Sequence, residues 1–276
     1  MEQSSAGRIA SSLLESIKHL HGTWLFADIE ILKQLDSMAH GNAELLSDDS
    51  AGSGRRRARA NVIHRAKLES LLVRISSGDG RSAAARLEAL VEHRVLRVGL
   101  LLQCPSCAQR TWFGLGEITA RLTCERCLNE FPFPASSPPK DEWYYKATGP
   151  FSTENFAREF YAVLLAVHCL VQIHHAEVTW LPGVSIKRGA QSLEADFVAF
   201  RQEGTFNPEP PVAVLGECKT FDTLAEKDVR RMEALAQQFP GAALAFCTLR
   251  SELTRRERTL ISRLARQGRK YLHSDC

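Results

Sequence analysis

The sequence predicts an α/β protein with a mixed β-sheet, preceded by a four-cysteine ribbon and a mainly helical N-terminal region. Three observations lead to this expectation. Apolar residues recur at helical spacing over residues 1–44, and two Cys-x-x-Cys pairs follow near the middle of the chain. Toward the C-terminus, helical segments alternate with apolar runs of strand length, which is typical of α/β proteins.

Composition narrows the class of protein. The 276 residues are 44% hydrophobic and 24% charged, which suffices for a sizeable core and about two domains. The net charge of +3 permits nucleic-acid binding without requiring it. No stretch approaches the roughly 20 apolar residues of a membrane span, and the N-terminus lacks the order of a signal peptide. We therefore expect a cytoplasmic protein without membrane association, whose eight cysteines are reduced.

The N-terminal region, residues 1–98, is expected to be mainly helical. After the helices of residues 1–44, residues 45–60 are polar, contain glycine and serine, and end in arginines, which indicates an exposed linker. Residues 61–76 form a further helical pattern, and residues 82–103 indicate a helix that runs into a strand. Two helices and a strand are compatible with a small winged-helix unit, although a helical bundle gives the same pattern.

The cysteine pairs Cys104/Cys107 and Cys124/Cys127 predict a structural zinc site within a ribbon and connector over residues 99–148. Sixteen residues separate the pairs, and four thiolates complete a closed tetrahedral site. We expect the intervening residues to fold back as a short hairpin. A redox function for either pair is disfavoured, because two pairs occur at ribbon spacing. Such ribbons contact nucleic acid, contact protein or brace a neighbouring domain, and the sequence does not choose between these.

The C-terminal segment, residues 149–276, is expected to fold in the order helix, three strands, helix, strand, helix. Residues 152–175 form a long, largely apolar helix, and the strands and later helices follow from apolar runs and capping boxes. The expected strands cover residues 177–189, 192–202, 212–221 and 242–249. The capping boxes begin at Thr223 and Thr254 and open the last two helices.

Two acids and a lysine stand out in these strands. Asp196 lies within one apolar run, and Glu217 ends the next, followed two residues later by Lys219. Carboxylates from neighbouring strands can hold a divalent metal such as Mg²⁺. Because side chains alternate along a strand, Lys219 and Glu217 point to the same face. A Glu-x-Lys tripeptide is common by chance and often forms a solvated ion pair, but strand interiors are depleted of such residues, and buried charges require a partner or a metal.

This order of elements, with Asp196 in the second strand and Glu217 and Lys219 in the third, resembles the PD-(D/E)XK, or restriction-endonuclease-like, nuclease superfamily. The resemblance covers residues 150–270 and implies that these three residues are catalytic. It also implies that Asp196, Glu217 and the backbone carbonyl of Cys218 bind Mg²⁺ or Mn²⁺. Ala195 stands where the family has a proline. A further acid often comes from the family's first helix, and the candidates here are Glu154 and Glu159.

The function expected from the resemblance is metal-dependent hydrolysis of DNA phosphodiester bonds, in restriction and anti-phage defence or in mobile-element and repair processes. Two alternatives remain: a non-catalytic zinc-ribbon module with an inactive nuclease fold that binds nucleic acid or protein, and a zinc-ribbon, winged-helix DNA-binding regulator. The absence of a helicase or NTPase motif implies protein partners in any larger system. Two basic clusters either neutralise DNA phosphates or form solvated faces. They comprise Arg55, Arg56, Arg57, Arg59, Arg65 and Lys67, and Arg255, Arg256, Arg258, Arg263, Arg266, Arg269 and Lys270.

Overall fold

The computed structural model describes most of the chain and divides it into two compact units. The described residues are 2–39, 61–76, 80–133, 143–153, 156–174, 177–188, 191–202 and 210–274. One unit comprises residues 28–157, and the other comprises residues 1–27 together with 158–276. The segment boundaries expected at residues 98 and 148 remain predictions. The expected linker over residues 45–60 and the first basic cluster's Arg55–Arg59 lie outside the described residues.

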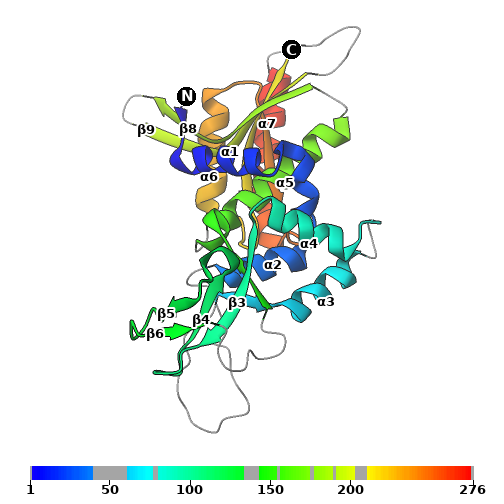
Figure 1. Ribbon diagram of the computed structural model, residues 1–276. Coiled ribbons are helices and arrows are strands. Elements are labelled where there is room, and N and C mark those ends of the chain that lie inside the picture. The colour runs from blue at the N-terminus through cyan, green and yellow to red at the C-terminus, as the bar shows by residue number, and fades with distance from the viewer. Residues whose placement is uncertain are drawn as a thin grey trace. The chain divides into compact units, whose positions relative to one another are not determined.

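The unit of residues 28–157 is built on antiparallel strands (Figure 1). Its four-stranded sheet has the order β2-β7-β3-β4, and β5 and β6 form a separate pair. The helices are α2 (Ile29–Met38), α3 (Arg65–Ser76), α4 (Ala83–Glu92), η2 (Leu115–Glu117) and η3 (Gly149–Ser152). The strands are β2 (Val62–His64), β3 (Leu96–Gln103), β4 (Arg110–Gly114), β5 (Arg121–Thr123), β6 (Glu130–Pro132) and β7 (Trp143–Ala147). The helix running into a strand, expected over residues 82–103, is present as α4 and β3.

The second unit is an α/β structure with a mixed sheet, as the sequence predicts. Its sheet has the order β1-β8-β9-β10-β11, in which β10 and β11 are parallel and the other neighbours antiparallel. The strands are β1 (Glu2–Gln3), β8 (Glu177–Arg188), β9 (Gln191–Gln202), β10 (Val212–Lys219) and β11 (Ala243–Thr248). The helices are α1 (Ser5–Ser16), η1 (His19–Phe26), α5 (Phe156–His174), α6 (Glu226–Gln238) and α7 (Arg255–Ser274).

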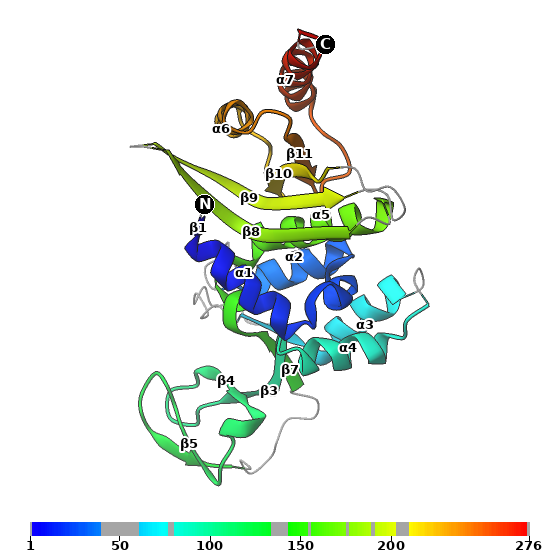
Figure 2. The same cartoon turned by 90° about the horizontal axis from the view of Figure 1, so that it is seen from above.

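The helices of this unit cover both faces of the sheet. Figure 2 shows α1 on one side of β8 and β9 and α6 on the other. On the α6 side, Met232 and Leu235 pack with Val198 of β9 and Leu215 of β10 in a buried apolar cluster. This packing follows from the amphipathic pattern of α6, whose apolar residues recur at helical spacing. The packing fixes α6 against the strands that carry the predicted site residues.

Residues 1–27 belong to this unit because they complete its sheet and its core. Strand β1 pairs with β8 through Glu2 and Gln3, and Ser4 N donates to Gly183 O at 2.7 Å. The ring of Phe26 in η1 lies 5.3 Å from that of Tyr161 in α5, and both side chains are buried. The helices expected in residues 1–44 are therefore present, but their first part folds with residues distant in the sequence.

The start of α6 differs from the sequence prediction. The capping box from Thr223 predicts a helix beginning at Leu224, whereas α6 begins at Glu226 with Ala225 as its N-cap. The Ala225 N–H donates to Asp228 Oδ2 at 2.8 Å, and the Leu224 N–H donates to Glu257 Oε1 at 2.7 Å. The N–H of Leu224, the residue expected to begin the helix, is thus hydrogen-bonded to Glu257, a residue distant in the sequence. The second capping box is confirmed at α7, where Thr254 and Glu257 exchange hydrogen bonds.

Candidate functional site

The predicted acids and lysine meet where β10 ends beside the middle of β9. The β9–β10 pairing places Gly216 opposite Phe197, which brings Glu217 next to Asp196. Asp196 Oδ2 accepts a hydrogen bond from the backbone N–H of Cys218 at 2.6 Å. A Cβ atom at Gly216 would overlap the Phe197 ring. The residue before Glu217 must therefore be glycine for the two strands to pair in this way. The structure therefore brings Asp196 together with Glu217 and Lys219, which follow it by more than twenty residues in the sequence.

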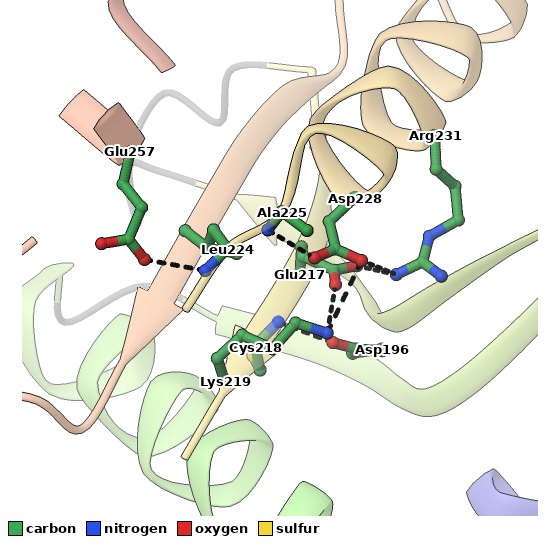
Figure 3. A network of polar contacts seen from close by, with 9 residues as sticks. All are labelled: Asp196, Glu217, Cys218, Lys219, Leu224, Ala225, Asp228, Arg231 and Glu257. Carbon is green, nitrogen blue, oxygen red and sulfur yellow. Dashed lines mark hydrogen bonds and ion pairs between the residues drawn. The ribbon is translucent and has the colours of Figure 1, made fainter. Parts of the chain in front are cut away.

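Glu217 is a fully buried acid held between two cations (Figure 3). Lys219 Nζ lies 3.0 Å from Glu217 Oε1, and the guanidinium of Arg231 contacts Glu217 Oε2. Cys218, between the two strand residues, faces the opposite side and is buried, as side-chain alternation predicts. The buried charge thus has the partners that its burial demands.

Helix α6 supplies two residues to the cluster that sequence reasoning missed. Asp228 is buried and lies 3.7 Å from Lys219 Nζ and 3.8 Å from the Arg231 guanidinium, measured at Asp228 Oδ1. Its other oxygen caps the start of α6. In the sequence, Asp228 and Arg231 are an acid and an arginine three residues apart in the helix predicted after the Glu-x-Lys strand. This signal is common on solvated helices and becomes specific only when α6 packs on the sheet.

The cations of the cluster do not fully offset the effects that raise the pKa of Asp196. Burial and the charge of Glu217 raise the pKa of Asp196 to about 7, against the opposing effects of the Cys218 N–H, Lys219 and Arg231. Burial lowers the pKa of Lys219, but the charge of Glu217 and its contact outweigh this effect, so the pKa rises overall. Lys219 is therefore a fixed cation at neutral pH. The three carboxylates exceed the two cations by one negative charge when all are ionised.

The donor atoms fit a divalent cation in type. Glu217 Oε1 is buried and accepts no hydrogen bond, although Lys219 Nζ lies 3.0 Å away as an ion pair. Lys219 is therefore the charged partner of this oxygen. Carboxylate oxygens of Asp196 and Glu217 and the carbonyl of Cys218 are the hard donors that Mg²⁺ and Mn²⁺ prefer.

Of the two acids proposed from the first helix, the structure describes only Glu159. Glu154 lies outside the described residues. Glu159 is exposed on α5, and none of the contacts described above comes from it. Within the described ranges, the carboxylates also form no group of three ligand atoms as compact as the cysteine group described next. A cation would thus be held mainly by Asp196 and Glu217.

The four predicted cysteines form a compact group that is placed to bind a metal ion. The sulfur atoms of Cys104, Cys107, Cys124 and Cys127 all lie within 4.8 Å of one another. Two of the distances are 3.7 Å, from Cys104 to Cys127, and 3.6 Å, from Cys107 to Cys124. A tetrahedral zinc site with Zn–S bonds of about 2.3 Å requires sulfur atoms about 3.8 Å apart. The observed spacing fits a single zinc ion.

The two cysteine pairs have the same backbone conformation. Cys104 N donates to Gln109 O at 2.8 Å and Cys124 N donates to Asn129 O at 3.0 Å. In each turn the residue after the second cysteine has positive φ: Ala108 at 56° and Leu128 at 57°. Burial raises the pKa of Cys104, but N–H groups of Cys107 and Ser106 outweigh it and lower the pKa to about 6. The first of these turns therefore favours a thiolate at Cys104, the form that binds zinc.

The hairpin expected between the cysteine pairs is not formed. Each pair instead lies in its own hairpin, β3–β4 for the first and β5–β6 for the second. The buried rings of Phe113 and Phe131 pack edge to face, with centroids 6.3 Å apart. The two hairpins thus face each other across a small apolar cluster that includes Cys104 and Cys124.

The fold and these sites define the class: an α/β protein with a four-cysteine metal site and a buried carboxylate cluster. No protein-family model matches the chain, and no curated protein matches it. Among solved structures, the chain is similar to one described as "MspJI Restriction Endonuclease in Complex with 27-mer Oligonucleotide". The sequences are 18% identical, the TM-score is 0.25, and the match covers 35% of this chain and 21% of that chain. Such a limited similarity carries no argument about function, which must come from the residues themselves.

No described helix is both long and apolar enough to cross a membrane.

Proposed function

We propose that the protein is a nuclease that hydrolyses DNA phosphodiester bonds with the help of Mg²⁺ or Mn²⁺. The observation that carries this proposal is the placement of Glu217. It is wholly buried at the end of β10, beside Asp196 of the next strand and 3.0 Å from Lys219. The order of elements in residues 156–274 also agrees with a restriction-endonuclease-like core.

The roles of the residues follow from their chemistry. Asp196, Glu217 and the Cys218 carbonyl would hold the cation, which supplies a polarised phosphate and a bound water of lowered pKa. Lys219 brings a second positive charge to the reacting phosphate. Because its pKa is raised, it offsets the negative charge of the transition state and does not act as a base. Arg231 adds a guanidinium, a second cation, beside the carboxylate of Glu217.

One observation favours a second function, that of a non-catalytic binding module with an inactive nuclease fold. Lys219 and Arg231 already neutralise Glu217 without a metal ion. A network of this kind also occurs as a structural ion-pair cluster. The two functions differ in whether a divalent cation binds Glu217 and supports cleavage.

The decisive experiment is DNA cleavage by the wild type and by the Lys219→Ala variant, with plasmid and linear DNA in Mg²⁺ and in Mn²⁺. The wild type should cleave, and the variant should be slower by about 10²–10³-fold, the usual effect of losing one group that stabilises transition-state charge. Lys227→Ala is the matched control, because Lys227 is exposed on α6 close to the cluster. Equal activity in wild type and Lys219→Ala, or no cleavage by either with both metals, would contradict the nuclease proposal.

The proposal has consequences for the rest of the chain. The cysteine group would hold a structural zinc ion, consistent with its sulfur spacing. The seven described cysteines are free thiols, which suits the reducing cytoplasm. Restriction, anti-phage defence, mobile-element processing and repair are the processes that use such an activity. Protein partners would supply any motor function.

A further inference from the structure

Helix α7 presents one strongly basic face. Five exposed arginines lie on it, and at 3.6 residues per turn they fall within an arc of about 160°. The apolar residues Leu260, Ile261 and Leu264 lie on the opposite side and are half-buried. We call the exposed side the arginine face; it consists of Arg255, Arg256, Arg258, Arg263 and Arg266.

The charge of the arginine face is not neutralised by neighbouring acids. None of its five arginines forms an ion pair with an acid among the described residues. Elsewhere on the described surface such pairs are frequent: Lys33 with Glu30, Arg65 with Glu69, Arg97 with Glu117, Lys187 with Glu2 and Arg230 with Glu226. The acid in the first turn of α7, Glu257, is buried away from this face. The arginine face therefore carries free positive charge that suits a polyanion.

Glu257 fixes this helix to the neighbourhood of the carboxylate cluster. It accepts a hydrogen bond from Leu224 N at 2.7 Å (Figure 3). It also accepts one from Thr254 N at 2.7 Å and contacts Arg250. Burial opposes ionisation, but these donors lower the pKa of Glu257 to about 2, so it stays charged. Leu224 belongs to the segment that joins β10 to α6, five residues after Lys219. Glu257, in the first turn of α7, thus connects the start of the arginine face to the segment that follows Lys219.

We propose that the arginine face binds the phosphodiester backbone of a DNA duplex and guides it toward the carboxylate cluster. Guanidinium groups pair with phosphates in a planar, two-point geometry that lysine lacks. Arg255 and Arg266 are about 16 Å apart along the helix axis, since each residue rises 1.5 Å. A duplex carries one charge per 1.7 Å of its axis, about ten over that length, which is ample for five arginines. The guiding role rests on the proposed nuclease function; the binding does not.

A lipid surface fits the helix less well. An amphipathic helix binds membranes by inserting its apolar side. Leu260, Ile261 and Leu264 are half-buried, and α7 packs against α6. The side left open is the arginine face, which offers charge without an apolar surface to insert.

The test is the binding of a fluorescein-labelled 20-base-pair DNA duplex without added divalent ions, followed by fluorescence anisotropy from 50 to 300 mM NaCl. The variant carries Arg255→Gln, Arg258→Gln and Arg266→Gln. Each lost phosphate contact should reduce the slope of log K against log[salt] by about 0.9, so the three should reduce it by about 2.7. Affinity at 100 mM NaCl should fall at least about tenfold.

The control variant removes the same charge elsewhere, through Arg8→Gln, Lys33→Gln and Lys187→Gln, all at exposed residues. It should bind with nearly the wild-type slope. Wild-type binding by the arginine variant, or an equal loss in both variants, would overturn the inference, as would binding to phosphatidylserine vesicles without binding to the duplex. Because no cleavage is measured, loss of binding in the arginine variant supports the inference even if Lys219→Ala leaves cleavage unchanged.

Discussion

Glu217 illustrates how one buried charge organises its surroundings. A carboxylate in an apolar interior is costly unless it is paired and hydrogen-bonded. Here Lys219 approaches one oxygen and Arg231 contacts the other. Asp228 lies within 4 Å of both cations and so holds them in place. Both oxygens of the buried Glu217 carboxylate therefore have a cationic partner within the protein.

Replacement of Arg231 should expose the cost of this burial. Arg231→Gln leaves one oxygen of Glu217 without its charged partner, and the free energy of unfolding at pH 7 should fall by about 1–3 kcal/mol. Urea denaturation measures the change. Arg230→Gln is the matched control, because Arg230 is its chain neighbour but is 74% exposed in its pair with Glu226. Exposed pairs contribute little, so the control should lose no more than about 0.5 kcal/mol.

The double variant Glu217→Gln/Arg231→Gln separates the ion pair from simple loss of packing. If the buried charge causes the instability, Arg231→Gln should cost much less when residue 217 is already neutral. An equal cost in both backgrounds would show that Arg231 acts through packing alone.

The sequence indicated three of these five charged residues. Asp196, Glu217 and Lys219 were recognisable because acids and lysine are rare inside apolar strands, and because alternation puts Glu217 and Lys219 on one face. Asp228 and Arg231 were not recognisable, since a helix normally carries such residues on its solvated side. Their role depends on the packing of α6 against β9 and β10, which is a tertiary contact that local pattern does not encode.

Helix starts show the same division between local and distant causes. The start of α7 follows from Thr254 and Glu257, which cap it through local hydrogen bonds. The start of α6 lies two residues beyond the one predicted from Thr223. Glu257 takes the N–H of Leu224 in a contact that spans 33 residues of sequence. A capping box therefore predicts a helix start well only when no distant acid competes for the same N–H groups.

The cysteine turns were predictable because their chemistry is local. Each turn needs only two thiolates, a short loop and one residue with positive φ, and both turns have the same hydrogen bonds. The hairpins that contain these turns were not predictable. The strands between the two cysteine pairs, β4 and β5, do not pair with each other but with strands outside the intervening segment, β4 with β3 and β5 with β6. The metal group is thus assembled between two hairpins.

Removal of one cysteine should abolish metal binding at this group. Purified wild-type protein should contain about one zinc ion per chain, and Cys124→Ser should contain almost none, because a structural site needs all four ligands. Atomic absorption measures the content. Limited proteolysis should then show cleavage between residues 104 and 127, since metal binding supplies folding energy to such segments. Cys169→Ser, which changes an exposed cysteine outside the group, should keep its zinc; equal zinc in all three proteins would refute the site.

The two compact units do not follow the chain in simple order. The segment boundaries at residues 98 and 148, expected from local patterns, stay predictions. The compact units are set by strand pairing and core packing, which place residues 1–27 with residues 158–276. Strand β1 extends the sheet at β8, and η1 contributes Phe26 to the core beside Tyr161. Two residues of strand at the N-terminus are too short a pattern to predict such a pairing.

The backbones of α1 and β8 are in close contact at Gly7, so a Gly7→Ala substitution tests whether residues 1–27 dock on β8. At Gly7, a Cβ atom would overlap the carbonyl oxygens of Pro182 and Gly183, the latter at 2.5 Å. Gly7→Ala should therefore lower the free energy of unfolding by about 1–3 kcal/mol in urea, even though alanine favours a helix by up to about 1 kcal/mol. Gly116→Ala, where a Cβ atom meets nothing within 4 Å, should change it by no more than about 0.5 kcal/mol. If Gly7→Ala proves neutral or stabilising, residues 1–27 do not dock on β8 in this way, and the C-terminal unit must complete its sheet without them.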